Sequence, residues 1–315
     1  MNWRYRFALL FMAALLPALA GCMFMKVNLK DEVKPLEEKV VSGDGRDKVL
    51  LMDISGMITS QESSSVLGGD RKMSIVSRVR EELERARKDR AVKAVVLRIN
   101  SPGGGVTASD TLYHEIRKYR QDTGVKVIAH LMDLGTSGAY YTALAADKIL
   151  AQPTTVTGGI GVIMIRLDAT GLMQKVGLQA LEITSGERKN MGSLFRPITA
   201  EERKLFQGII DSLFARFADT VAEERKLSRE AVKSVADGRI MSSQEARAAG
   251  LIDDIGYLED SLERAKKEAG ITEARIVTYH REGEYRPTIY SMSLINLDLG
   301  ELLEPGMKFL YLWWP

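Results

Sequence analysis

The sequence predicts an α/β fold in which a largely parallel sheet is followed by a C-terminal helical part. Two observations predict it: short apolar runs typical of buried strands alternate with amphipathic runs of helical period, and a long amphipathic helix follows them. Strand, helix and strand in short alternation imply right-handed crossovers and parallel pairing. With 45% hydrophobic and 27% charged residues, the 315-residue chain has the composition of an ordinary globular protein.

The first half of the chain supplies repeated strand and helix units. Each expected strand is a short apolar run, and each expected helix carries apolar residues three and four positions apart. In chain order the expected elements are a strand at KVLLMDIS, a helix from Ser74 to Asp89, a strand at AVKAVVLRIN, a sharp turn at SPGGG, a helix from Thr107 to Arg120, a strand at VKVIAHL, a helix at SGAYYTALAAD and a strand at KILA.

The second half adds shorter elements and one long helix, whose beginning is marked by the capping box of Thr199 and Glu202. A second capping box, Ser242 with Glu245, opens a short helix that Gly250 closes. The other expected elements are a strand after TGGIGV, a helix from Asp168 to Val176, a strand at LQALEIT, a polar loop over 185–198, the long helix to about Lys226, and an aromatic tail, FLYLWWP, that suits a packing edge or a membrane-facing anchor.

The N-terminus predicts export and membrane attachment. Arg4 and Arg6 precede the apolar run Phe7 to Ala20, which is shorter than the roughly 20 residues that span a bilayer. The run ends at Gly21 and Cys22 and resembles a bacterial lipoprotein signal, in which the cysteine is lipidated. A cleavage site or uncleaved anchor that merely contains a cysteine is the alternative. We therefore expect a signal peptide (1–21), a tether (22–47), a main domain (48–280) and a C-terminal extension (281–315).

Charge and cysteine content exclude several classes of protein. The 44 basic and 42 acidic residues give a net charge of +2, which leaves no electrostatic footprint for nucleic acid. The single cysteine, Cys22, allows no intramolecular disulfide and no metal site built on several thiolates. We expect no metal and no cofactor.

Two small-residue segments are candidates for chemistry. The glycine-rich turn after Asn100 frees backbone N–H groups to point into open space, as stabilisation of an oxyanion requires, although such a turn also serves structure alone. Ser137 lies between a strand and a helix, where we expect the turn to expose its hydroxyl and the N–H of Gly138 to face the same oxyanion. The simpler interpretation of Ser137 is a helix N-cap, and the two are compatible.

A serine nucleophile needs a base, and the residues leave its identity open. His114, His130 and His280 each fit an ordinary buried or solvated histidine, so a Ser-His-Asp triad has little support. Lys189 in the loop SGERKN is a candidate if burial keeps its amine neutral; otherwise it is a solvated loop charge. Arg188 cannot serve, because a guanidinium stays protonated.

Taken together, the motifs RINSPGGGV, TSGAYYTALAADKILA, TGGIGV, ITSGERKN and DGRIMSSQEARAAGLIDDIG resemble the signal peptide peptidase A family over roughly residues 48–270. The family consists of membrane-bound serine proteases with a crotonase-like or Clp-protease-like fold of repeated β-β-α units. The resemblance implies that Ser137 is the nucleophile and Lys189 the general base. It also implies that the N–H groups of Gly104 and Gly138 line the oxyanion hole.

The resemblance further implies a homo-oligomeric ring, typically an octamer, that encloses the active sites. Two departures stand out: Gly159 replaces a serine that contacts the catalytic lysine in many relatives, with Thr157 as one candidate substitute, and a lipidated Cys22 replaces the usual transmembrane helix. We expect substrates to bind by strand addition as extended, mostly apolar peptides with small or aliphatic side chains in the pockets.

The sequence thus predicts a serine endopeptidase of the cell envelope, tethered to membrane lipids through Cys22 with its protease domain outside the cytoplasm, that degrades cleaved signal peptides or other membrane-associated peptides. Three alternatives remain. One is an acyl-CoA hydratase or thioesterase on the same fold, which export argues against. The second is a non-catalytic scaffold of that fold. The third is a protease for membrane-protein quality control or for processing a secreted product.

Overall fold

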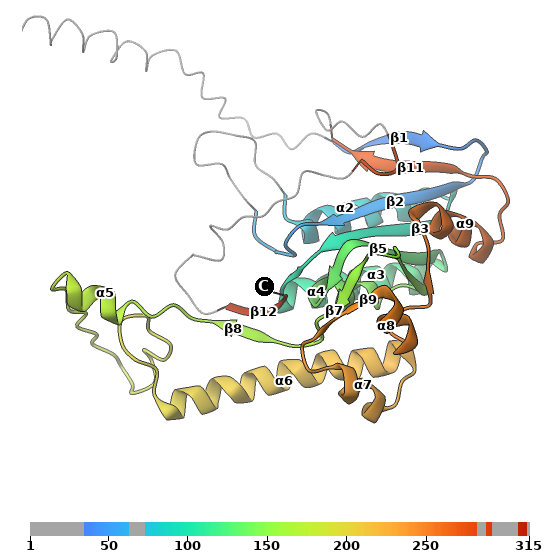
Figure 1. Cartoon of the computed structure of the whole chain (residues 1–315). Coiled ribbons are helices and arrows are strands. Elements are labelled where there is room, and N and C mark those ends of the chain that lie inside the picture. Colours follow the sequence, from blue (N-terminus) through green and yellow to red (C-terminus); the bar gives the residue numbers. More distant parts are fainter. Residues whose placement is uncertain (1–34, 63–72, 282–287, 292–307, 314–315) are drawn as a thin grey trace, which may run out of the picture. The chain divides into compact units, whose positions relative to one another are not determined.

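The computed structural model describes residues 35–62, 73–281, 288–291 and 308–313 (Figure 1). All of its helices and strands belong to one compact unit, Pro35–Gln61 with Met73–Pro315. The predicted signal peptide and Cys22 lie outside the described residues. Within those residues, no helix combines the length and the apolar character needed to cross a membrane.

A mostly parallel sheet forms the centre of the unit, and in the described residues it has nine strands in the order β1-β11-β2-β3-β5-β6-β10, with β7 on β5 and β9 on β7. Only β1 with β11 and β7 with β9 pair antiparallel within it. The strands of this sheet are β1 (Glu37–Ser42), β2 (Lys48–Ser55), β3 (Val92–Ser101), β5 (Lys126–Thr136), β6 (Lys148–Ala151), β7 (Val156–Gly158), β9 (Ile240–Ser242), β10 (Asp254–Ile255) and β11 (Arg275–His280). The predicted α/β class is confirmed.

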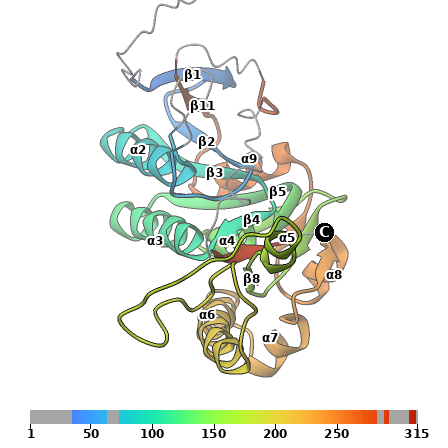
Figure 2. The ribbon, with the colours of Figure 1, turned by 90° about the vertical axis from the view of Figure 1, so that its left-hand side faces the viewer.

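Helices cover the central sheet on both faces (Figure 1, Figure 2). The helices of the described residues are α2 (Ile75–Lys88), α3 (Val106–Thr123), α4 (Gly138–Ala143), α5 (Thr170–Lys175), α6 (Ala200–Arg225), α7 (Arg229–Val235), α8 (Ser243–Ala248) and α9 (Leu258–Glu268), and α5 lies away from the sheet. A second sheet, three-stranded in the described residues, has the order β4-β12-β8 and consists of β4 (Gly103–Gly105), β12 (Lys308–Leu312) and β8 (Ile163–Ile165).

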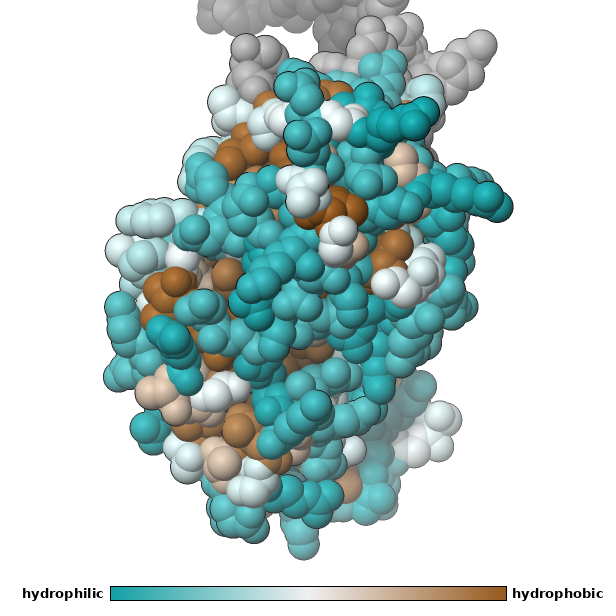
Figure 3. Space-filling model, turned by 90° about the vertical axis from the view of Figure 1, so that its right-hand side faces the viewer, coloured by the Kyte–Doolittle hydropathy of each residue, from teal (hydrophilic) through white to brown (hydrophobic). Residues whose placement is uncertain are grey.

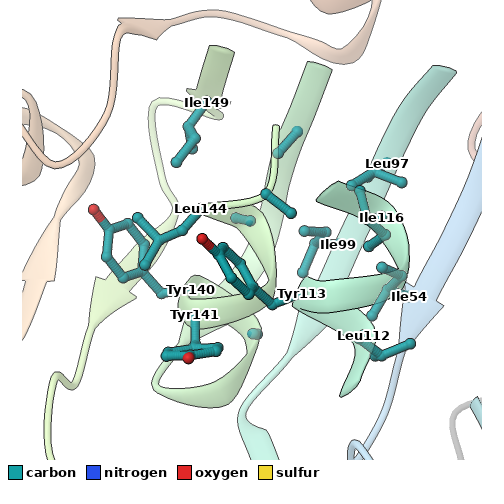
Figure 4. Close-up of a cluster of buried hydrophobic side chains, with 14 of the residues drawn as sticks. Ile54, Leu97, Ile99, Leu112, Tyr113, Ile116, Tyr140, Tyr141, Leu144 and Ile149 are labelled. Atoms are coloured by element: carbon teal, nitrogen blue, oxygen red, sulfur yellow. The ribbon is translucent and has the colours of Figure 1, made fainter. Parts of the chain in front are cut away.

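Alternate residues of the central strands enter two different cores. Leu50 and Met52 of β2 join the large cluster that includes α2, α3 and α4, whereas Val49 and Leu51 join the smaller cluster beneath α9. Because successive side chains of a strand point to opposite faces, a sheet covered on both sides needs apolar residues at nearly every position. Figure 4 shows the larger core, in which tyrosines from α3 and α4 pack beside aliphatic side chains of the sheet.

Both predicted capping boxes form. Thr199 and Glu202 exchange hydrogen bonds at the start of α6, and Ser242 and Glu245 do so at the start of α8. At its other end α6 is capped by Lys226, which adopts the left-handed conformation with a φ of 55°. The capping-box patterns in the sequence therefore predicted correctly where these two helices begin.

Three segments differ from expectation. LQALEIT, residues 178–184, was expected to be a strand but forms none, because no described strand lies beside it and a strand needs a partner for its backbone N–H and C=O groups. Within the predicted tether, Glu37–Ser42 forms β1. The aromatic tail is a packing strand: β12 inserts between β4 and β8, with Leu310, Tyr311 and Leu312 buried.

Candidate active site

Ser137 lies where β5 ends and α4 begins, in a backbone conformation unusual for a residue with a side chain. Its φ is 54° and its ψ is −117°, and such sparsely populated conformations cost about 1–3 kcal/mol. The Ser137 N–H donates to the Gly158 carbonyl at 2.7 Å, and the Tyr141 N–H donates to the Ser137 carbonyl at 2.8 Å. The turn is therefore held by β7 on one side and by the first turn of α4 on the other.

The Ser137 hydroxyl does not act as a helix cap. Ser74, Ser228 and Ser242 begin α2, α7 and α8, and each side chain accepts a hydrogen bond from a backbone N–H of the first helical turn. Ser137 occupies the same position before α4, yet its side chain makes no such bond to the described residues. The capping interpretation therefore does not account for a serine here.

Gly104 and Gly138 lie next to each other, although they belong to β4 and α4. A methyl group on Gly138 would lie 3.2 Å from the Gly104 nitrogen and only 2.3 Å from the Ser109 hydroxyl oxygen. A methyl group on Gly104 would lie 2.1 Å from the Ile58 carbonyl oxygen. Neither position has room for a Cβ, so only glycine allows the two backbones to approach this closely beside Ser137.

A peptide carbonyl already lies beside these glycines. The Tyr311 oxygen of β12 would be 3.0 Å from a methyl group on Gly138 and 2.1 Å from one on Gly103. Tyr311 is also the residue directly opposite Gly104 in the antiparallel β4–β12 register. The carbonyl oxygen of an extended strand thus lies beside Gly138 and Gly103, on the strand that pairs with Gly104.

Gly159 also borders Ser137. A methyl group there would lie 3.5 Å from the Ser137 Cβ and 3.6 Å from the Thr136 Cβ. Thr157, considered above as a substitute for the family serine, uses its hydroxyl to donate to the Gly135 carbonyl at 2.7 Å. The Thr136 hydroxyl is buried and has no hydrogen-bond partner among the described residues.

The histidines lie elsewhere. His130 is on the face of the sheet that α9 covers, with its Nδ1 2.7 Å from the Ser261 hydroxyl oxygen, and burial lowers the pKa of His130 to about 4. Its neighbours on that face belong to the smaller core, whereas α4 packs in the larger one. His114 is exposed on α3, and His280 ends β11. None of the three is hydrogen-bonded to Ser137 in the described structure.

Lys189 lies in a long, exposed segment of the described chain. We call residues 166–198, which comprise α5 and its flanking loops, the arm; it extends away from α4 (Figure 1). The Lys189 side chain is exposed, and its backbone N–H donates to the Gly186 carbonyl at 3.0 Å. The structure therefore does not bring Lys189 and Ser137 of one chain together.

The arm nevertheless has internal order. Glu182 accepts hydrogen bonds from Asn190 at 2.6 Å and from Ser193 at 2.5 Å, and these bonds lower the pKa of its carboxyl group. Arg188 pairs with Glu201 of α6 at 2.5 Å. Lys189 is thus flanked by residues with fixed partners, and the loop that carries it has a defined shape.

Comparison with known proteins gives the class of the chain. Residues 119–272, which contain both Ser137 and Lys189, match the family model of peptidase family S49. A candidate signal peptide peptidase SppA of Enterococcus faecium is 34% identical over 246 residues, which cover 78% of this chain and 71% of that protein. A candidate protease of Methanocaldococcus jannaschii is 36% identical over 224 residues, covering 70% of this chain and 71% of that protein. Protease 4 of Haemophilus influenzae is 29% identical over 76% of this chain and 38% of its own length.

These matches define a serine peptidase. The chain belongs to peptidase family S49, and within it to the signal peptide peptidase type. The predicted family and enzyme class are confirmed. Membership of a peptidase family disfavours both the acyl-CoA enzyme and the non-catalytic scaffold.

Sequence reasoning missed two features of the site. The strand β12 was seen only as an aromatic tail, although its sequence, KFLYL, is a short apolar run of the kind that predicts a buried strand. The Thr136 hydroxyl was overlooked because nothing in the sequence distinguishes an unpartnered threonine from one that bonds to the backbone.

Proposed function

We propose that this chain is an envelope serine endopeptidase in which Ser137 attacks extended peptides bound along β4. One observation carries the proposal. Ser137 is held in a strained turn, with no capping role, beside Gly138, and the carbonyl oxygen of Tyr311, on the strand that pairs with Gly104, already lies next to Gly138. A nucleophile next to backbone N–H donors aimed at a carbonyl oxygen is the arrangement that acyl transfer requires.

The reaction follows from this geometry. The Ser137 Oγ attacks the substrate carbonyl carbon while a neutral lysine amine takes its proton, and the N–H groups of Gly104 and Gly138 stabilise the oxyanion. The protonated lysine then gives the proton to the leaving amine, which leaves an acyl-enzyme on Ser137. Water, deprotonated by the same lysine, attacks the acyl-enzyme, releases the peptide carboxylate and restores the serine.

Lys189 is the proposed base, and we assign it to a neighbouring copy of the chain. A lysine works as a base only when burial keeps its amine neutral, and Lys189 is exposed within a single chain. The arm also exposes apolar side chains, with Leu181 91% and Ile183 92% exposed. Docking of one copy's arm on the next copy covers these side chains and buries Lys189 in one step, which favours the ring expected from the family resemblance.

Thr136 is the proposed substitute for the serine missing at Gly159. Its hydroxyl is buried without a partner, and its Cβ lies 3.6 Å from the position of a Gly159 Cβ. A hydroxyl at this place, next to Ser137, can accept a hydrogen bond from an incoming ammonium group. Thr157 is the second candidate: its hydroxyl donates to the Gly135 carbonyl and keeps lone pairs with which to accept, but no contact in the described structure places it against Ser137 as Gly159 places Thr136.

The proposed substrates are signal-peptide remnants or other membrane-associated peptides. Support comes from the name of the Enterococcus faecium relative, signal peptide peptidase SppA, and from the predicted lipoprotein signal that ends at Cys22. Attachment through a lipidated Cys22 would keep the protease at a membrane surface outside the cytoplasm, beside such peptides. Quality control of membrane proteins is the alternative task, and it uses the same site.

The test is hydrolysis of fluorogenic apolar peptides by the purified full chain in mild detergent, with Ser137→Ala as the inactive variant. We expect turnover by the wild type, labelling of Ser137 by a fluorophosphonate, and a loss of about 10⁴-fold in Ser137→Ala. Ser228→Ala is the matched control, because it removes a true helix cap on exposed α7 and should lower stability by about 1 kcal/mol without affecting turnover. Full activity of Ser137→Ala would reject the proposal.

A further inference from the structure

The two strands that lead to the site, β3 and β5, lose their regular pairing just before they reach it. They pair in parallel up to Ile99 opposite Leu131, and the next pair is Ser101 opposite Gly135. Over this step β3 advances two residues and β5 advances four, so β5 bulges. Because Ser137 and the glycine-rich turn follow directly, the shape of the bulge decides where the nucleophile stands relative to the oxyanion donors.

The loop between β6 and β7 holds the bulge from one side. The Thr155 hydroxyl is buried and lies 2.9 Å from the Leu131 carbonyl oxygen and 2.5 Å from the Met132 carbonyl oxygen. The Gln152 N–H also donates to the Leu131 carbonyl, at 3.0 Å. These bonds satisfy carbonyl groups that the break in strand pairing would otherwise leave without a partner.

The side chain of Asn100, at the end of β3, holds the bulge from the other side. Asn100 is 8% exposed, and its Oδ1 accepts a hydrogen bond from the Leu134 N–H at 3.1 Å. Its Nδ2 donates to the Asp133 carboxylate at 3.2 Å. A backbone N–H only donates and a carboxylate only accepts, so a neutral amide satisfies both, whereas a carboxylate or an aliphatic side chain at this position does not.

The backbone of Asn100 belongs to the segment that carries the oxyanion glycine. The Gly56 N–H donates to the Asn100 carbonyl at 3.0 Å, and the Ile58 N–H donates to the Gly103 carbonyl at 2.8 Å. The Gly105 N–H in turn donates to the Ile58 carbonyl at 2.9 Å. The segment that follows β2 therefore fixes the glycine-rich turn, and the Asn100 side chain connects this fixed turn to the strand that ends at the nucleophile.

We propose that Asn100 is a positioning residue that sets the distance between the Ser137 hydroxyl and the Gly104 N–H, and that Asp133 holds its amide in place. The inference deepens the proposed function and rests on it. Asn100 lies four residues before Gly104, and Leu134 lies three residues before Ser137, so a shift at their hydrogen bond reaches both groups through short lengths of backbone. A misplacement of about 1 Å in an active site costs about 100-fold in rate.

The experiment exchanges the two polar groups in the full-length protein and measures hydrolysis of a fluorogenic apolar peptide in mild detergent. Asn100→Asp puts a second carboxylate beside Asp133. We expect kcat to fall about 30-fold with KM within about 2-fold of the wild type, because oxyanion donors act mainly in the transition state. Adding Asp133→Asn restores one amide and one carboxylate, and kcat should return to within about 5-fold of the wild type. Asp133→Asn alone should keep most activity, since two amides still pair.

Ser261→Ala is the matched control for stability. Ser261 is also buried and hydrogen-bonded, to His130, but it lies on α9, over the smaller core. Its removal should lower the unfolding temperature by roughly a few degrees and leave kcat unchanged. Fluorophosphonate labelling of Ser137, which uses the same oxyanion donors, should slow in Asn100→Asp in proportion to kcat. If Asn100→Asp does not fold, Asn100→Ala buries no charge and should lower kcat about 10-fold.

Wild-type kcat in a folded Asn100→Asp or Asn100→Ala protein would overturn the positioning role. A folded double variant no faster than Asn100→Asp would overturn it as well, because the exchanged pair makes the same contacts. Failure of the wild type to cleave peptides or to react with a fluorophosphonate would instead reject the proposed function.

Discussion

The region around Ser137 and the arm around Lys189 are built in opposite ways. Ser137 is 2% exposed and is enclosed by segments of its own chain, from Gly158 on β7 to Tyr311 on β12. The arm places Leu181 and Ile183 almost fully in solvent. The first region is enclosed within a single chain, whereas the second exposes apolar side chains of the kind that mark interaction surfaces.

This difference supports the proposal that the arm contacts a second copy of the chain. The end of the unit shown in Figure 3, on the side away from α5, is mostly hydrophilic with small separate hydrophobic patches, as expected of a surface that faces water. The exposed apolar residues of the arm are, in contrast, grouped on one segment: Leu167, Leu172, Val176, Leu178, Leu181, Ile183 and Phe195. In the proposed mechanism, the nucleophile and the oxyanion donors come with the chain's own core, and the base comes from a neighbouring copy.

Removing the base is expected to have the largest effect on turnover. Lys189→Ala should lower kcat by about 10³–10⁴-fold while leaving the unfolding temperature of the chain unchanged, because the side chain is exposed and supports no core contact. Peptide hydrolysis and thermal unfolding measure the two effects. Lys175→Ala, an exposed lysine on the same arm, is the matched control and should retain most activity.

The Lys189 prediction includes a test of coupling. If Ser137 and Lys189 act as one unit, the double variant should be no slower than the slower single variant. A double variant much slower than either would mean that the two residues act separately.

Disrupting the arm's apolar surface should reduce turnover through assembly. Leu181→Glu combined with Ile183→Glu should shift the protein in light scattering to a smaller species and lower activity at least about 10-fold, because a charge cannot be buried in an apolar contact. The fold itself should be unaffected, since both side chains are exposed. Val40→Glu, at an exposed position of β1, is the control. If the arm variant still forms the oligomer, the arm is not part of the interface.

Removing the Thr136 hydroxyl is expected to lower turnover less than removing the Lys189 amine. Thr136→Val should lower kcat/KM about 10-fold, the scale of one hydrogen bond to a charged group, and shift the pH profile of kcat/KM, because the lysine loses a hydrogen-bond acceptor. Gly159→Ser in the Thr136→Val background should restore part of the activity if a hydroxyl at either position serves. Thr136→Ser should keep it as well. A Thr136→Val protein with wild-type kinetics would contradict the role.

His130 should affect stability but not catalysis. Its pKa of about 4 in the folded protein lies below the ordinary value of about 6.5, so the unfolded chain binds more protons between these pH values. The free energy of unfolding should therefore fall by a few kcal/mol as pH drops from about 6.5 to 4. His130→Asn should flatten this dependence in denaturant titrations and keep peptide turnover at pH 7. An unchanged slope, or lost turnover in a folded variant, would contradict the assignment.

The sequence predicted local structure well wherever one segment carried the signal. The capping box of Thr199 and Glu202, the parallel strands and the turn before α4 are all readable from short patterns. LQALEIT shows the limit: the segment is a short, largely apolar run that predicts a strand, but its backbone finds no partner strand within the described chain. Pattern alone does not say whether an apolar segment packs within its own chain or against another.

The site was predictable in its residues but not in its spatial arrangement. Ser137, Gly104 and Gly138 lie together because β3 and β5 are neighbouring parallel strands, and neighbouring parallel strands end at the same edge of a sheet. Lys189 and Tyr311 escaped this reasoning, since one lies on an arm outside the sheet and the other on a strand added from the C-terminus. Their positions depend on contacts between segments far apart in the chain.

Subunit complementation tests the central claim, a dyad shared between two copies, most directly. Ser137→Ala and Lys189→Ala proteins, each inactive alone, would be co-expressed in equal amounts and purified as mixed oligomers. If each site takes its serine from one copy and its lysine from the next, about a quarter of the sites pair two intact residues, and about a quarter of wild-type activity should return. A mixed oligomer as inactive as either parent would contradict the account and place both residues of each working site in a single chain.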